Sequence, residues 1–332
     1  MSLPPSEIPS GAMRFNSDSQ KLEYYDGAQW LQVSTFSPLL NGGARGVFGG
    51  GGDGVNVIQY VTISTTGNAQ DFGDLPANRT SQGACSSSTR GIFSQGYSGI
   101  GNVNTIDYVT ISSTGNAQTF GEMITTRRNC DSCSNETRAI FAAGYTSVSV
   151  NNIEYLTISS TGNSIDFGDT DVPLYSLLAL SSPTRGVFGG GYGNSPVATV
   201  NTIQYITIST LGDTQDFGDL TSVIVAGNAC SSSTRGLFGG GYTPTTVNTI
   251  EYIEISSLGN AINFGDLTVA RSRISSTSSK IRGLWSGGFN PATINVIDYV
   301  SIATQGNAVD FGDLISGTEI FNAACSNAHG GL

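Results

Sequence analysis

The stretch NVIQYVTISTTGNAQDFGD, residues 56–74, decides the fold. Its first half alternates β-branched and polar residues, which is the pattern of a half-buried β-strand. The Gly67-Asn68 pair predicts a tight hairpin, because glycine adopts positive φ freely and asparagine tolerates it. The segment AQDFG that follows is therefore predicted to be the partner strand.

This pattern recurs along the chain with its phase intact. A tyrosine in the context N-x-I-x-Y marks each of six copies, at intervals of 48, 47, 50, 47 and 47 residues. Each copy has a glycine seven residues after the tyrosine and a phenylalanine twelve residues after it. The marker tyrosines are Tyr60, Tyr108, Tyr155, Tyr205, Tyr252 and Tyr299.

Each copy predicts four short strands, which we call a (ACSSS), b (RGxFGG), c (NxIxYxxIS) and d (NAxDFG). Four antiparallel strands per repeat of this length are typical of a β-propeller blade. The chain opens on a strand b near Ala44 and ends on a strand a near Phe321. We therefore expect an all-β protein, with a six-bladed propeller over residues 41–332 that closes by pairing the C-terminal strand a with the N-terminal strands b, c and d.

The repeat resembles the kelch repeat. The resemblance lies in the paired glycines after an apolar strand, the tyrosine downstream and the aromatic residue about a dozen positions further on, and it covers residues 44–328. The glycine pairs that carry it are Gly190-Gly191, Gly240-Gly241 and Gly287-Gly288. Phenylalanine stands here where kelch repeats usually have tryptophan, and the resemblance implies a fold rather than a function.

Residues 1–40 differ from the repeats and predict a two- or three-stranded β appendage with turns at SDSQ and YDGA. The segment R-F-N-x-D-x-x-K-L-E-Y-Y-D-G-x-x-W resembles a short segment of structural proteins of tailed bacteriophages, and the GNAxDFGDL repeats resemble cyanophage-type virion proteins. The resemblance implies that this appendage docks the protein onto other virion proteins. The docking candidates are Arg14, Phe15, Tyr24, Tyr25 and Trp30.

Composition excludes several classes of function. Charged residues are 12% of the chain, and 14 Lys+Arg against 25 Asp+Glu give a net charge of −11, which disfavours nucleic acid or an anionic membrane surface as a partner. The single histidine, His329, leaves little room for histidine-based catalysis or metal binding. No apolar run is long enough for membrane insertion. We expect a protein that is not an enzyme and has no cofactor.

Four features of the sequence invite a functional interpretation. The in-phase arginines at the a–b turn are expected to pack between blades. Cys130 and Cys133 form a C-x-x-C, expected as buried structural thiols, with a disulfide left open. The asparagine four residues before each tyrosine and the acid fourteen after it are expected to cap loop amides, with bound calcium as the alternative. The in-phase aromatic residues at the end of strand b are expected to pack there or to stack on sugars: Tyr97, Tyr145, Tyr192, Tyr242 and Phe289.

The b–c and d–a loops vary between copies whereas the a–b and c–d turns do not, so we expect the binding surface on the b–c and d–a face. The favoured hypothesis is a non-enzymatic virion structural protein, a tail, fibre, baseplate or capsid-surface component present in several copies per particle. Its propeller would offer a rigid platform for protein or host-surface contacts. The alternatives are a glycan-binding or glycan-acting host-recognition protein and an intracellular kelch-like adaptor.

Overall fold

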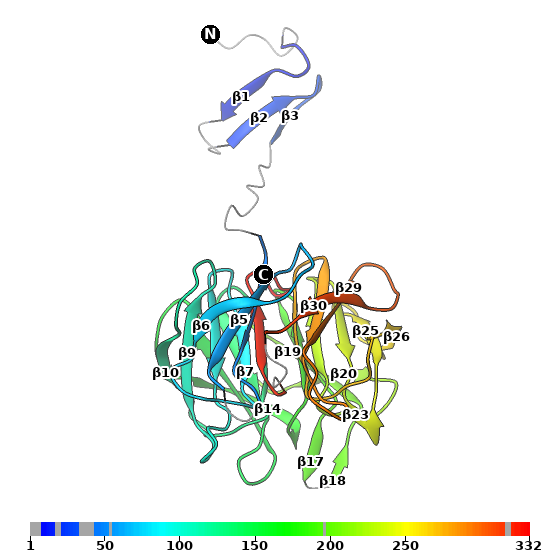
Figure 1. The fold of residues 1–332 in the computed structure, drawn as a ribbon. Helices are drawn as coiled ribbons and strands as arrows, with labels where there is room; N and C mark the ends of the chain where they lie inside the picture. The colour runs from blue at the N-terminus through cyan, green and yellow to red at the C-terminus, as the bar shows by residue number, and fades with distance from the viewer. Residues whose placement is uncertain (1–7, 17–20, 33–42, 53–54, 195–196, 316–319) are drawn as a thin grey trace. The chain divides into compact units, whose positions relative to one another are not determined.

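The computed structural model describes residues 8–16, 21–32, 43–52, 55–194, 197–315 and 320–332. These residues form strands and no helix, which confirms the all-β class. The chain divides into two compact units, residues 1–40 and 41–332. Figure 1 shows the strands of both units.

The larger unit contains six four-stranded antiparallel sheets, each with its strands in the order a, b, c, d. The a strands are β7 (Gly83–Ser86), β11 (Asp131–Ser134), β15 (Leu178–Ser181), β21 (Asn228–Ser231), β27 (Ser275–Ser278) and β31 (Ala323–Ser326). The b strands are β4 (Arg45–Gly49), β8 (Arg90–Ser94), β12 (Arg138–Ala142), β16 (Arg185–Gly189), β22 (Arg235–Gly239) and β28 (Arg282–Ser286).

The c strands carry the marker tyrosines and the d strands carry the phenylalanines. The c strands are β5 (Val57–Thr62), β9 (Thr105–Thr110), β13 (Val150–Thr157), β19 (Thr202–Thr207), β25 (Thr249–Glu254) and β29 (Val296–Ser301). The d strands are β6 (Gln70–Asp74), β10 (Gln118–Glu122), β14 (Ile165–Leu174), β20 (Gln215–Asp219), β26 (Ile262–Asp266) and β30 (Val309–Asp313). Two small hairpins extend b–c loops: β17 (Tyr192–Asn194) with β18 (Val197–Thr199), and β23 (Tyr242–Thr243) with β24 (Thr245–Thr246).

The first sheet joins the two ends of the larger unit. Strand β31 pairs antiparallel with β4, with Cys325 opposite Val47, so the order of this sheet is β31-β4-β5-β6. The pairing of the last strand a with the first strand b is therefore confirmed. Each a strand also lies against the a strands of two other sheets, in the order β7, β11, β15, β21, β27, β31 and back to β7.

The core lies between neighbouring sheets. In each copy the tyrosine of strand c meets the phenylalanine of strand d edge to face, with ring centroids 5.8–6.0 Å apart. In five of the six copies, glycine at the second position of strand b leaves room for the preceding sheet, and the third copy has Ala139 there. A Cβ on Gly91 would lie 2.8 Å from the sulfur of Cys325, and one on Gly283 would lie 2.6 Å from the sulfur of Cys230. Buried cysteine here packs as a small apolar residue.

The prediction that Gly67-Asn68 forms the tight hairpin is wrong. The turn falls earlier, where the amide of Thr65 donates to the carbonyl of Thr62 at 3.1 Å. The amide of Gly67 instead donates to the carbonyl of Phe311 in the sixth sheet at 2.8 Å, and the Asn68 side chain accepts a hydrogen bond from the amide of Asp313. The equivalent glycine bonds the strand d of the preceding sheet in all six copies, so this motif holds sheets together.

The smaller unit is a three-stranded antiparallel sheet in the order β1 (Met13–Asn16), β2 (Lys21–Tyr25), β3 (Trp30–Gln32). Asp26 closes the turn between β2 and β3, since its carboxylate accepts hydrogen bonds from the amides of Ala28 and Gln29 at 2.8 Å. The turn predicted at residues 17–20 lies outside the described residues.

Candidate binding site at the central cavity

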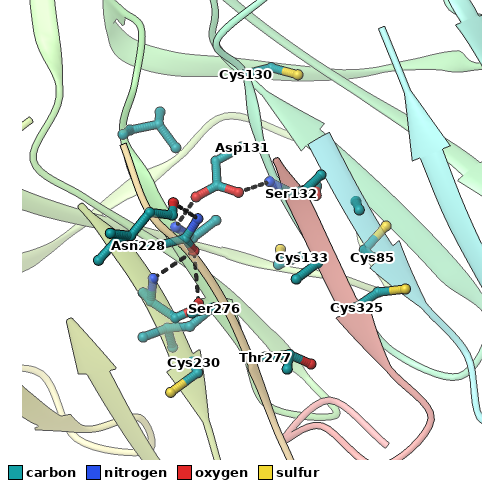
Figure 2. Close-up of a pocket in the computed structure, with 18 of the residues that line it drawn as sticks. Cys85, Cys130, Asp131, Ser132, Cys133, Asn228, Cys230, Ser276, Thr277 and Cys325 are labelled. Carbon is teal, nitrogen blue, oxygen red and sulfur yellow. Dashed lines mark hydrogen bonds between the residues drawn. The ribbon is translucent and has the colours of Figure 1, made fainter. Parts of the chain in front are cut away.

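A cavity of about 110 Å³ lies among the a strands, and all six of them contribute to its wall. Its lining is mostly small: serine, alanine, cysteine and threonine side chains. Figure 2 shows the polar and thiol side chains that surround it. Small residues are needed here because six strands converge on one space, and larger side chains would fill it.

Serines close the wall at the ends of the a strands. The hydroxyl of Ser134 donates to the carbonyl of Ser86 at 2.7 Å, and those of the equivalent serines in the fourth, fifth and sixth sheets each donate in the same way to the sheet before. Ser86 in turn donates to the carbonyl of Ser326 at 2.7 Å. This serine is the last residue of each strand a, so the sheets bond to one another directly beside the cavity.

The five cysteines are all buried and free, so Cys130 and Cys133 form no disulfide in this structure. Burial raises the pKa of every thiol, that of Cys130 to about 12. A nucleophilic or metal-binding cysteine needs the thiolate. The expected role as buried structural thiols is therefore confirmed.

A carboxyl side chain lines the cavity wall in the third sheet. Asp131 accepts hydrogen bonds from the amides of Ser132 and Ala179, each at 2.8 Å, and burial raises the pKa of its carboxyl to about 7. Asn228 occupies the equivalent position in the fifth sheet and bonds the amide of Ala229 and the hydroxyl of Ser276. The hydroxyl of Ser132 is buried without a hydrogen-bond partner.

The C-terminal residues cover the wall next to the serines. The Nε2 of His329 lies 2.9 Å from the carbonyl of Ser86, and its Nδ1 accepts a hydrogen bond from the amide of Gly331 at 3.1 Å. This pair of contacts defines the neutral tautomer with the proton on Nε2. Burial lowers the pKa of His329, which favours the same neutral form.

The d–a segments form the other edge of the cavity. One residue of each segment has φ between 52° and 59°, and its amide donates to the carbonyl of the equivalent residue one sheet earlier, at 2.6–3.1 Å. The six hydrogen bonds return to their starting point. We call this edge the rim. The rim also includes the side chains beside this edge, which are those of Arg128, Arg273, Tyr175 and the in-phase aromatic residues. The residues of the hydrogen-bond cycle are Ser81, Asn129, Ser176, Ala226, Arg273 and Phe321.

The in-phase aromatic residues lie beside this cycle, at the expected b–c and d–a face. Each forms a β-bridge with the residue just before a member of the cycle, such as Tyr97 with Thr80 and Tyr192 with Tyr175. Tyr242 is the most exposed of the five, at 48%, and the others are half-buried. None of the five lines the cavity wall itself, and the structure places all of them beside the hydrogen-bond cycle that borders it: Tyr97, Tyr145, Tyr192, Tyr242 and Phe289.

Sequence reasoning missed two rim residues that connect these rings. Tyr175 lies 5.3 Å from Tyr145 and 5.4 Å from Tyr192, centroid to centroid. The guanidinium of Arg128 lies 4.9 Å from the centre of the Tyr97 ring and 5.3 Å from that of Tyr145. Both residues stand in d–a loops whose sequence differs in every copy, so periodicity carried no signal for them.

The other recurring groups act between or within sheets. The a–b arginines bond across sheets, as expected: Arg90 lies 4.8 Å over the Tyr108 ring and donates to the carbonyl of Ile158 in the next sheet at 3.0 Å. In three copies the side-chain NH2 of the asparagine before the tyrosine donates to a backbone carbonyl, as Asn56 does to Leu75 at 3.2 Å, and does not cap a loop amide as expected. Among the described residues no group of three His, Cys, Asp or Glu is placed to hold a metal ion.

The docking candidates separate onto two faces of the N-terminal sheet. Arg14 pairs with Glu23 at 2.8 Å and lies 4.2 Å over the Trp30 ring, which contacts Tyr25 at 5.4 Å. Residues on the opposite face are exposed, Phe15 at 66% and Tyr24 at 39%. Arg14, Tyr25 and Trp30 therefore hold the small sheet together, whereas Phe15 and Tyr24 present an open surface.

Neither a protein-family model nor a curated protein matches this chain. No described helix is long and apolar enough to cross a membrane.

Proposed function

We propose that the six sheets are the blades of a closed six-bladed β-propeller. The observation that supports it most directly is the pairing of β31 with β4, combined with contacts between sheets that recur from the first sheet to the sixth and back. Small-angle scattering of residues 41–332 tests this. A compact disc-like particle is expected, and an elongated row of sheets would contradict the proposal.

We propose further that the protein is a non-enzymatic structural component of a tailed-phage particle, assembled in the host cytoplasm and present in several copies per virion. The N-terminal sheet would attach it to other virion proteins, and the propeller would serve as a rigid platform. The observation that carries this proposal is the open apolar face of the small sheet. Its members are Met13, Phe15, Leu22 and Tyr24, each at least 37% exposed.

The pairing register explains why these four side chains share a face. Met13 lies opposite Tyr24, and Phe15 lies opposite Leu22, in the β1–β2 pair. Residues two apart on a strand, and residues directly opposite across a pair, point to the same side of a sheet. An exposed apolar face of this kind is typical of a protein-interaction site.

Deletion of residues 1–40 tests the docking role. We expect the truncated chain to fold and to be missing from purified particles. A sharper variant is Phe15→Ser with Leu22→Ser, which removes apolar area without touching the Arg14–Glu23 pair. Val269→Ser, which changes an exposed apolar residue of the larger unit, is the matched control. Full incorporation of the truncated chain would contradict the docking proposal.

The rim supports a second candidate function, a glycan-binding role in host recognition. Its aromatic side chains lie beside the hydrogen-bond cycle and beside the loops that vary most. Aromatic rings bind the apolar faces of sugars. A glycan array on the full chain tests this candidate, and an array without any hit would contradict it.

A further inference from the structure

The contacts that each arginine makes distinguish two of them, Arg128 and Arg273, from the rest. The chain has twelve arginines. Six extend from the start of strand b and donate to a carbonyl of the next sheet. Three are buried beside a carboxylate, in the pairs Arg79–Asp107, Arg127–Glu154 and Arg271–Asp298.

Arg14 pairs with Glu23 in the small sheet. This leaves Arg128 and Arg273. Neither guanidinium makes an ion pair or a hydrogen bond with the described residues, and both lie on the rim. Five of the six a–b arginines also lack a carboxylate partner among the described residues, but each of them donates to a backbone carbonyl. What sets Arg128 and Arg273 apart is that their N–H groups have no acceptor in the described part of the chain.

Both side chains are held in the same way, between two aromatic rings. The guanidinium of Arg128 lies between Tyr97 and Tyr145, and that of Arg273 lies 5.4 Å from the Phe289 ring and 5.0 Å from the Phe321 ring. A guanidinium that stacks on rings keeps the N–H groups of its planar edge free to donate. Stacking also fixes the side chain, so binding loses less conformational entropy.

The two arginines occupy opposite positions in the hydrogen-bond cycle. Asn129, which follows Arg128, and Arg273 are three steps apart among its six members. Asn129, Arg273 and Phe321 all line the cavity. Arg128 itself is not part of the cavity wall, so the rim carries two positive charges on segments that lie on opposite sides of the hydrogen-bond cycle.

We propose that the rim binds the carboxylate groups of an acidic glycan, with Arg128 and Arg273 as the two anion-binding residues. The planar edge of a guanidinium matches a carboxylate in a two-bonded pair. Beside Arg128, the rings of Tyr145, Tyr175 and Tyr192 form a continuous aromatic arc. This arc suits the apolar face of a sugar ring adjoining the carboxylate, which favours a uronic-acid polymer over an acidic peptide.

This inference deepens the glycan-binding candidate and is independent of the docking role, since its test uses the isolated full chain. Binding of oligogalacturonate is measured by isothermal titration calorimetry, alongside its neutral methyl ester and poly-glutamate. We expect oligogalacturonate to bind and the methyl ester to bind at least tenfold more weakly, because esterification removes the anion and leaves the sugar.

Three variants separate specific contacts from bulk charge. Arg128→Gln and Arg273→Gln should each weaken oligogalacturonate binding about tenfold or more, and the double variant should abolish it. Lys280→Gln removes the same charge from an exposed position at the a–b turn of the sixth sheet and should leave affinity within twofold. Thermal unfolding of each variant checks that the fold is retained.

Several outcomes would overturn the proposal. Equal binding of oligogalacturonate and its methyl ester would exclude recognition of the carboxylate, and wild-type affinity in the double variant would exclude these arginines. An equal loss in Lys280→Gln would assign the effect to net charge. Binding of poly-glutamate without oligogalacturonate would identify an acidic protein segment as the partner in place of a glycan. Absence of binding to all three probes would equally reject the site.

Discussion

The pKa of Asp131 leads to a quantitative prediction about stability. This carboxyl has an ordinary pKa of 3.8, and burial raises it to about 7 in the folded protein. The folded state therefore binds the proton more tightly than the unfolded state. Between these two values, the contribution of Asp131 to stability falls as the pH rises, and above pH 7 the loss is complete.

The full shift corresponds to about 4 kcal/mol at 1.36 kcal/mol per pKa unit. Between pH 5 and pH 8, titration of Asp131 changes the free energy of unfolding by at most about 2.6 kcal/mol of this total. Because the side chain is only half-buried, screening by solvent weakens the effect. We expect a change of about 1–2.5 kcal/mol over this pH range.

The variant Asp131→Asn removes the titrating group and keeps its shape. Asn228 already holds the equivalent position in the fifth sheet, with its side-chain oxygen accepting from the amide of Ala229 and its NH2 donating to the carbonyl of Ile274. The side-chain oxygen of the introduced asparagine keeps the amide of Ser132 as a donor. The amide of Ala179 loses a carboxylate acceptor, which costs about 1 kcal/mol at every pH.

Urea unfolding at several pH values between 5 and 8 measures the effect, followed by the fluorescence of the buried Trp285. The stability of Asp131→Asn relative to wild type should rise by about 1–2.5 kcal/mol from pH 5 to pH 8. The converse variant, Asn228→Asp, places a carboxyl in the equivalent position and should lose stability over the same range. A difference between Asp131→Asn and wild type that does not change with pH would refute the reasoning.

Three further predictions follow from the contacts between sheets. Ser278→Ala removes the hydroxyl that donates to the carbonyl of Ser231 at 2.8 Å, and it should lower the free energy of unfolding in urea by about 1–2 kcal/mol. The control Ser257→Ala, at an exposed turn, should lower it by less than about 0.5 kcal/mol. Equal losses in the two variants would contradict this prediction. Gly73→Ala should destabilise the protein by at least about 2 kcal/mol more than Gly67→Ala. Both glycines have φ near 150°, but only at Gly73 would a Cβ lie 2.5 Å from a carbonyl oxygen, that of Gly115. Similar melting temperatures of the two variants would count against this close approach. All five thiols should be inert to a thiol reagent in the folded protein and react after denaturation, and rapid labelling of the native protein would contradict their burial.

The sheets could be predicted from the sequence because each copy places the same residue types at the same positions. The tyrosine, the phenylalanine and the small residues of strand a have one environment repeated six times. The contacts between sheets could not be predicted in the same way. Gly67-Asn68 looks like a local hairpin, and only the neighbouring strand d shows that its hydrogen bonds go to the preceding sheet.

The rim was less accessible to prediction for a different reason. Its hydrogen-bond cycle holds a positive φ at residues of different types, including Ala226, Arg273 and Phe321. Such a backbone conformation costs about 1 kcal/mol or more in a residue other than glycine, and residue preference would not predict it. The hydrogen bonds to neighbouring copies stabilise it instead, so the conformation recurs although the sequence does not.

The division between recurring and variable positions is the basis for placing the proposed binding site on the rim. A residue that occurs in every copy and bonds the next sheet, such as Arg90, serves the contacts between sheets, and its substitution should act through stability. Arg128 and Arg273 belong to the variable d–a loops and make no hydrogen bond or ion pair with the described residues. Substitution there should leave stability nearly unchanged, since stacked surface cations contribute about 1 kcal/mol or less. An effect on ligand binding without an effect on stability is what distinguishes a binding residue from a structural one.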